Sequence, residues 1–330
     1  MGYADTPVIA GGGHTLCPGQ SLAVARYRFR FRMEGDLALP EYAGSLLRGQ
    51  FGAALRRVAC MTGAKACSGC PLLRTCPYPA IFETPAPPAH ALQKFSQVPN
   101  PYVIEPPPIG TRRIAAHTPF EFGLVLVGHA LDRLPLIAYA LQRAFGHGLG
   151  KKRIQGGLED IVWEDEVAPV SVWDGERGCI RPHAPGLVVP ALDGARQARL
   201  TITTPLRLQS QGHPLGPEAI GPRKLLTTLM RRASLLFDLH AGLPGVAADA
   251  PALARQAETL GDARNLRWHD WTRYSSRQQA EMTLGGVVGE WILEGDLRGL
   301  AAWLWLGQWI HAGKNATMGM GRYTVSFLAA

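Results

Sequence analysis

The sequence predicts an α+β protein made of two tandem ferredoxin-like domains, the first of which carries a cysteine-rich insertion. Three observations support this prediction. The expected elements run strand, helix, strand, strand, helix, strand, and the same order recurs in the second half of the chain. Each half ends its second helix in a glycine and lysine turn that leads into a strand, at 148–151 and at 313–314. Four cysteines follow the first helix closely.

Changes in composition suggest the domain boundaries. We expect a flexible lead-in at 1–20, a first domain at 21–165 with a cysteine knuckle at 60–76, a linker at 166–195 rich in proline and glycine, and a second domain at 196–330. No apolar run reaches the roughly 18 residues of a membrane span, and no basic segment leads into an apolar stretch near the start. We therefore expect a cytoplasmic protein that does not contact a membrane.

The first element is a strand over 24–34 with strict alternation. Aromatic residues and a methionine occupy one face, and four arginines occupy the other. The arginine face is either a platform for RNA or a solvated outer surface.

The other elements follow from helical spacing of apolar residues and from short apolar runs. In the first domain these are a helix over 40–60, strands over 102–105, 120–127 and 158–163, and a helix over 131–145. In the second domain they are strands over 198–208, 266–275, 287–293 and 323–328, and helices over 221–239 and 296–311. Asp296 is the expected N-cap of the last helix.

The charge balance indicates an anionic partner. The chain has 34 lysines and arginines against 26 acidic residues, which gives a formal net charge of +8. Nucleic acid is the simplest partner for a basic protein that is rich in arginine.

The clustered cysteines are Cys60, Cys67, Cys70 and Cys76. One Cys-x-x-Cys pair with two nearby cysteines can close a tetrahedral thiolate site. Zinc is the first expectation and an iron–sulfur cluster the second, while four free cysteines are the alternative. We expect the site to stabilise the insertion rather than take part in chemistry.

The segment 311–323 combines three glycines with Lys314 and Arg322 between a helix and a strand. Glycine lets the backbone approach a ligand, and cationic side chains bind phosphate. The alternative is a tight turn whose glycines adopt positive φ. A Walker A loop is excluded, because here Gly-Lys comes first and the order is helix, loop, strand.

Five stretches together resemble the CRISPR-associated repeat-RNA-processing endoribonucleases of the RAMP superfamily, whose hallmark is a C-terminal glycine-rich loop. They are LPxxxGSLLRG at 39–49, the cysteine knuckle, GLGK at 148–151, RYSSRQ at 273–278 and GKxxxxGxGRY at 313–323. The resemblance covers most of residues 22–328.

This resemblance implies a fold of tandem ferredoxin-like domains and a substrate that is the repeat of precursor CRISPR RNA. It also implies cleavage without a metal, in which the 2′-hydroxyl of the RNA attacks the adjacent phosphate and leaves a 2′,3′-cyclic phosphate. Two alternatives stay open. One is a non-catalytic RAMP-type subunit that holds RNA with other subunits of a CRISPR effector complex. The other is an unrelated enzyme built around the cysteines.

Cleavage of this kind needs a general base, a general acid and a cation near the phosphate. Many members of the family carry a catalytic histidine on or just after the first helix, but residues 40–60 contain none. The catalytic candidates are therefore His311, His269, Tyr274 and Lys314. The RNA-binding candidates are Arg48, Lys151, Lys152, Arg153, Arg277, Gly313, Gly319, Gly321 and Arg322.

Overall fold

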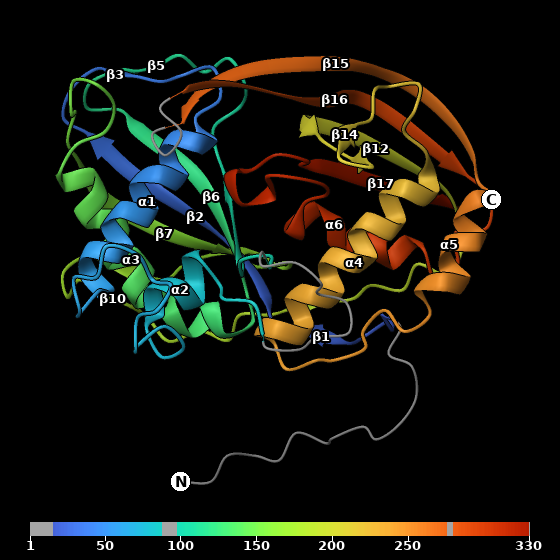
Figure 1. The fold of residues 1–330 in the computed structure, drawn as a ribbon, viewed down its shortest axis with the longest axis horizontal. Helices are drawn as coiled ribbons and strands as arrows, with labels where there is room; N and C mark the ends of the chain where they lie inside the picture. Colours follow the sequence, from blue (N-terminus) through green and yellow to red (C-terminus); the bar gives the residue numbers. More distant parts are fainter. Residues whose placement is uncertain (1–15, 88–97, 276–279, 330) are drawn as a thin grey trace, which may run out of the picture.

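The computed structural model describes residues 16–87, 98–275 and 280–329, which form two lobes side by side (Figure 1). The N-terminal lobe contains a five-stranded sheet and the C-terminal lobe a four-stranded sheet, and both sheets are antiparallel. Most of the predicted lead-in and the candidate Arg277 lie outside the described residues.

The main elements of the N-terminal lobe agree with the predicted ones. They are β2 (Val24–Met33), α1 (Gly44–Ala59), β4 (Tyr102–Glu105), β6 (Pro119–Val127), α3 (Leu134–Gly146) and β7 (Gly156–Glu164). The sheet order is β4-β6-β2-β7, extended at the edge by β8 (Pro169–Ser171). The second, third, first and fourth strands thus lie in the order of a ferredoxin-like sheet.

Alternation in β2 decides which face of this sheet the helices cover. Tyr27, Phe29, Phe31 and Met33 are fully buried and belong to one core with the apolar stripes of α1 and α3. The arginines point to the other face, and each pairs with a glutamate of another strand of the sheet. The pairs are Arg26–Glu105, Arg28–Glu164, Arg30–Glu121 and Arg32–Glu159. For Arg28, Arg30 and Arg32 this arrangement favours the solvated outer surface over the RNA platform, because their positive charges already have partners, whereas Arg26 is largely buried where the lobes meet.

The C-terminal lobe repeats the strand order of the first. Its elements are β12 (Ala195–Leu206), α4 (Pro222–His240), α5 (Ala250–Glu258), β15 (Gly261–Ser275), β16 (Ala280–Glu294), α6 (Ala301–Ile310) and β17 (Tyr323–Ala329). The sheet order is β15-β16-β12-β17. α4 and α6 pack on one face of this sheet in a second core that also receives Val24 and Val127 from the first lobe.

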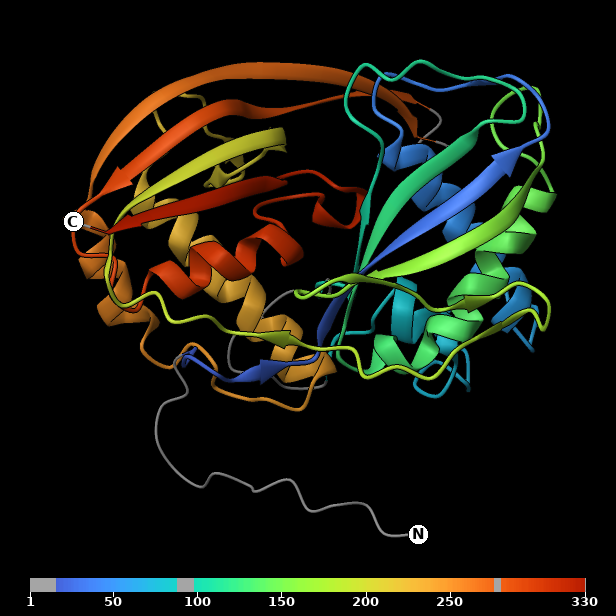
Figure 2. The ribbon, with the colours of Figure 1, turned by 180° about the vertical axis from the view of Figure 1, so that it is seen from behind.

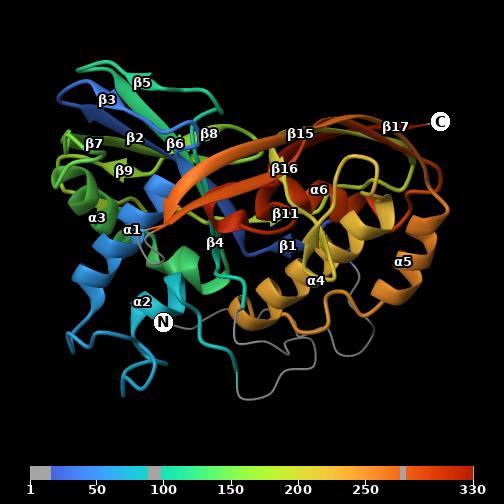
Figure 3. The same ribbon diagram turned by 45° about the horizontal axis from the view of Figure 1, so that its top comes forward.

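Three details differ from the predictions. β15 and β16 pair over fifteen residues each and form a hairpin much longer than expected, which reaches over to the N-terminal lobe (Figures 1 and 3). α5 lies between the predicted helix at 221–239 and the predicted strand at 266–275, where no element was expected. The prediction that Asp296 caps the last helix is wrong, because α6 starts at Ala301 and the Asp296 carboxylate instead accepts a hydrogen bond from the backbone N–H of Arg298 at 3.1 Å.

The segment expected as a linker, 166–195, is tied to both lobes. Besides β8 it carries β9 (Trp173–Asp174), β10 (Cys179–Ile180) and β11 (Leu187–Val188). Trp173 packs in the first core, whereas β11 pairs with β1 (Ser21–Leu22) beneath the second lobe (Figure 2).

The remaining elements are short. They are β3 (Leu37–Ala38), α2 (Pro77–Phe82), β5 (Arg113–Ile114), β13 (Gln209–Ser210), β14 (His213–Pro214) and the 3-10 helices Gly128–Arg133 and Ala316–Met318. Among the residues that the structure describes, no helix is both long and apolar enough to cross a membrane.

Candidate functional site at the lobe junction

The glycine segment, residues 311–322, lies where the two lobes meet. The Tyr42 hydroxyl, just before α1, donates a hydrogen bond to the Met318 carbonyl at 2.8 Å. On the other side the Thr204 hydroxyl donates to the Gly319 carbonyl at 2.7 Å and accepts from the Arg322 N–H at 2.8 Å. The segment is therefore fixed by polar contacts to both lobes, and we call this region the lobe junction.

The three glycines of the segment serve packing. All three have positive φ. A Cβ at Gly319 would lie 2.4 Å from Pro106 Cδ, and one at Gly321 would lie 1.9 Å from the Ala312 carbonyl oxygen. At Gly313 it would lie 2.6 Å from the Arg207 carbonyl oxygen. Protein atoms occupy the space that we expected RNA to use beside these glycines, so the tight-turn alternative describes them better.

A buried polar cluster lies directly beneath the segment. The Glu105 carboxylate, at the end of β4, accepts a hydrogen bond from Arg26 Nη2 at 3.0 Å and lies 3.0 Å from His311 Nε2. Arg322 approaches the same carboxylate at 3.7 Å. Burial raises the pKa of Glu105, but Arg26, then His311 and Arg322, outweigh it and lower the pKa to about 2. Glu105 is thus a carboxylate at neutral pH that binds both lobes together.

The prediction of His311 as a catalytic residue needs correction. Its side chain is fully buried, with Nδ1 3.2 Å from the Met320 carbonyl oxygen and Nε2 on Glu105. Burial lowers the pKa of His311, although the bond to Glu105 opposes that effect. Because neither nitrogen faces solvent, His311 holds the glycine segment in place and cannot reach a ribose hydroxyl.

The two cations of the segment remain accessible. Lys314 is exposed and its backbone N–H donates to the Arg207 carbonyl at 3.0 Å, while the Arg322 side chain is 37% exposed. Both can therefore meet a phosphate at the junction.

The long hairpin brings His269 to the start of α1. Its Nε2 is buried, lies 3.7 Å from the Glu41 carboxylate and has no hydrogen-bond partner among the described residues. The side chain is 20% exposed. Glu41 in turn accepts a hydrogen bond from Arg112 at 3.2 Å. The neighbouring Trp271 packs on Tyr42 with ring centroids 4.5 Å apart, which anchors the hairpin to the first lobe.

Other predicted residues lie elsewhere. Arg48 is half-buried with its guanidinium 4.5 Å from the centre of the Phe82 ring, so it packs α1 on α2. Lys151, Lys152 and Arg153 are exposed in the turn after α3, beside β3. The backbone of Tyr274 belongs to β15, but its side chain lies outside the described residues.

The sequence reasoning missed Glu41, Glu105 and Arg112. Glu105 could have been found from the sequence, since it is the one acid in the otherwise apolar strand Tyr102–Glu105. A carboxylate buried in such a strand needs a charged partner. Glu41 lies within the LPxxxG stretch that carried part of the resemblance, but nothing in the sequence pairs it with His269.

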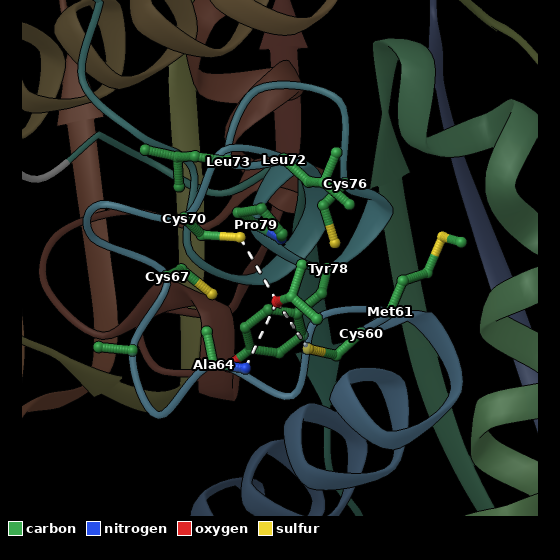
Figure 4. Close-up of a pocket in the computed structure, with 12 residues that line it drawn as sticks. Cys60, Met61, Ala64, Cys67, Cys70, Leu72, Leu73, Cys76, Tyr78 and Pro79 are labelled. Atoms are coloured by element: carbon green, nitrogen blue, oxygen red, sulfur yellow. Dashed lines mark hydrogen bonds between the residues drawn. The ribbon is translucent and has the colours of Figure 1, made fainter.

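The four clustered cysteines line one small cavity between the ends of α1 and α2 (Figure 4). The Thr62 hydroxyl lies 3.5 Å from Cys70 Sγ and 3.9 Å from Cys60 Sγ. The cavity measures about 20 Å³, the space of roughly one water. Within the described chain no three ligand side chains are close enough together to hold a metal. In number and type the four thiolates fit either a zinc ion or an iron–sulfur cluster.

Comparison with known proteins gives two family matches. Residues 22–185 match the model of an N-terminal domain, and residues 200–323 match that of the CRISPR-associated endoribonuclease Cas6. A comparison with curated proteins gave no significant match.

Solved structures share the fold. A Cas6 product complex has a TM-score of 0.56 at 18% identity, and Thermus thermophilus Cas6 has 0.50 at 19%. Each match covers 93% of this chain and 99% of the other. A partial Cas6-RT-Cas1–Cas2 complex has a TM-score of 0.53 at 13% identity, over 93% of this chain and 47% of that one.

Proposed function

We propose that the chain is a Cas6-type CRISPR-associated endoribonuclease, which binds precursor CRISPR RNA repeats and cleaves them at the lobe junction. One observation carries the proposal. An imidazole beside a carboxylate, His269 with Glu41, lies in the same junction as the accessible cations Lys314 and Arg322.

The proposed chemistry uses these groups in separate roles. The ring nitrogen of His269 that faces away from Glu41 takes the proton of the 2′-hydroxyl, and Glu41, on the side of the buried Nε2, stabilises the imidazolium that forms. The 2′ oxygen then bonds to phosphorus, and the bond from phosphorus to the 5′ oxygen breaks. The leaving 5′ oxygen receives a proton from the imidazolium. Lys314 and Arg322 stabilise the extra negative charge on the phosphorane. The products are a 2′,3′-cyclic phosphate and a 5′-hydroxyl, and no step requires a metal.

This assignment gives the chain a base although α1 carries no histidine. The absence of a histidine from α1 also favours a second function, in which the protein holds repeat RNA inside an effector complex without cutting it. In either case the RNA would meet both lobes, which we treat as two domains at 21–165 and 196–330.

The cysteine cavity has a separate role in this proposal. Cys60, Cys67, Cys70 and Cys76 would hold one structural zinc ion that joins the ends of α1 and α2. An ion there would stabilise the N-terminal lobe, because it would cross-link a segment that has little regular structure.

The test is incubation of the purified protein with repeat RNA in excess EDTA, beside His269→Ala, Glu41→Gln and Lys314→Ala variants. We expect one cut with a cyclic phosphate end, and a loss of about 10²–10⁴-fold in rate for His269→Ala. The exposed His213 provides the matched control, since His213→Ala should cleave like the wild type. Tight binding without cleavage would support the RNA-holding subunit instead. A protein that neither binds nor cuts the repeat would overturn both functions.

A further inference from the structure

A groove separates the C-terminal halves of α1 and α3 on the helical face of the N-terminal lobe. Its volume is about 260 Å³. The lining residues are Ala54, Arg57, Val58, Tyr139, Arg143 and His147. The groove therefore joins three basic or titratable side chains to one aromatic ring, and no carboxylate from the described part of the chain lines it.

The positive charge in the groove is not neutralised. Neither Arg57 nor Arg143 forms an ion pair with any residue that the structure describes, and Arg57 Nε donates only to the Ala53 carbonyl at 3.3 Å. The arginines of β2, on the opposite face of the same lobe, all have glutamate partners. This contrast within one lobe points to an anionic ligand at the helices rather than at the sheet.

The aromatic residue narrows the class of ligand. Tyr139 is 51% exposed, so its ring is accessible to a ligand. It lies four residues before Arg143 and eight before His147, so the three side chains follow one face of α3. An exposed ring beside unpaired arginines is the combination that binds single-stranded nucleic acid, because the ring stacks on a base while the cations hold phosphates.

The basic turn after α3 extends this surface. Arg153 Nε donates to the His147 carbonyl at 3.3 Å, so the turn folds back against the end of the groove. Lys151 and Lys152 are exposed in the same turn. Three of the predicted RNA-binding residues are thus adjacent to the groove, which accounts for basic side chains that the lobe junction does not use.

We propose that the α1–α3 groove binds a single-stranded stretch of the RNA substrate outside the cleavage site, with a base stacked on Tyr139 and phosphates on Arg57 and Arg143. The proposal rests on the proposed function, since the ligand is the same RNA. Gly44 packs against Met318 at the junction, and Arg57 lies thirteen residues further along α1, or about 20 Å. The groove therefore receives nucleotides that flank the cut.

The experiment compares binding of two RNAs by fluorescence anisotropy: the repeat with extended flanks on both sides, and a version trimmed to the nucleotides around the cut. Tyr139→Ala and the double variant Arg57→Ala/Arg143→Ala are expected to bind the extended RNA at least about fivefold more weakly. Both should bind the trimmed RNA like the wild type. The double variant should also reduce the slope of log K against log salt by about 1.4.

The controls separate this site from a general charge effect. Arg30→Ala/Arg32→Ala removes the same net charge from the opposite face, where both arginines are already paired, and should leave the affinity for the extended RNA unchanged. Tyr139→Phe keeps the ring and should bind like the wild type.

Equal weakening in the control double variant, or unchanged affinity in the groove variants, would overturn the proposal. Unchanged RNA affinity together with lost binding to an acidic protein surface would also overturn it, in favour of a protein partner. If the wild type cleaves the repeat and the groove variants bind the extended RNA as tightly as the wild type does, the groove proposal fails but the proposed function stands. If the wild type does not bind repeat RNA, the proposed function fails with it.

Discussion

Replacing Glu105 by glutamine should destabilise the protein strongly, because this carboxylate is the only negative charge in the buried cluster described above. It is 2% exposed and faces Arg26 and His311 at 3.0 Å and Arg322 at 3.7 Å. The variant keeps the size of the side chain but removes the carboxylate that Arg26 and Arg322 share, and it leaves Arg26 only the more distant Glu164, at 3.9 Å.

The pKa of Glu105 gives the size of the effect. Its usual value is 4.5, and the neighbouring cations, which outweigh burial, lower it to about 2. At 1.36 kcal/mol per pH unit, the interval between these values corresponds to about 3 kcal/mol of unfolding free energy. Breaking a buried ion pair by removing one partner costs a similar amount, about 3–5 kcal/mol. Because the folded pKa is the lower one, this stability is fully present above pH 4.5 and is lost as the pH falls toward 2.

Urea denaturation of the wild type and the Glu105→Gln variant at pH 7 and pH 3 tests this reasoning. The gap in unfolding free energy should be about 3 kcal/mol at pH 7 and less than half of that at pH 3. Glu121→Gln is the matched control on the adjacent strand: its carboxylate pairs with Arg30 near the surface, so the cost should stay below about 1 kcal/mol. A gap below 1 kcal/mol at pH 7, or one that does not shrink in acid, would refute the assigned role of Glu105.

Three further predictions concern other parts of the molecule. Burial lowers the pKa of His240 to about 4. Between pH 6.5 and 4 only the unfolded chain gains a proton at this residue, so the unfolding free energy of the wild type should fall by up to about 3 kcal/mol over this range. Urea titrations of the His240→Gln variant should not show this fall. Gly319→Ala should lower the melting temperature by several degrees, because its Cβ would lie 2.4 Å from Pro106 Cδ at a φ of +91°, whereas Gly49→Ala, in open space within α1, should not. Removal of metal by a strong chelator should lower the melting temperature yet leave cleavage by the folded protein unchanged at 25 °C; lost cleavage without unfolding would contradict a purely structural ion.

Sequence reasoning predicted the elements whose signal is local. The alternation in β2 and the helical stripes of α1, α3 and α4 each repeat over enough residues to fix the element and its buried face. The hairpin was predicted too short, because Gly285 and Gly286 interrupt the apolar pattern. The structure explains both glycines: a Cβ at Gly285 would meet Asp270, and one at Gly286 would meet the backbone of Leu206.

Contacts between distant residues were less predictable. His311 borders a glycine and lysine turn, which favoured a catalytic role, but its environment is set by Glu105, 206 residues away in the sequence. The β2 arginines resembled an RNA platform for a similar reason. Their partners Glu121 and Glu159 come from β6 and β7, and the pairing follows only from the register of three strands.

The same long-range contacts make the candidate site a property of the docked lobes. Glu41 belongs to the first lobe, while His269, Lys314 and Arg322 belong to the second, so no lobe holds the proposed base, its carboxylate and the cations by itself. Glu105 touches Arg26 of its own lobe and His311 of the other, and it is therefore a positioning residue whose loss should separate these groups. A defect in cleavage by Glu105→Gln would arise without any contact between this side chain and the RNA. If cleavage occurs at this junction as proposed, the stability of the junction and the activity are coupled, because one buried carboxylate supports both.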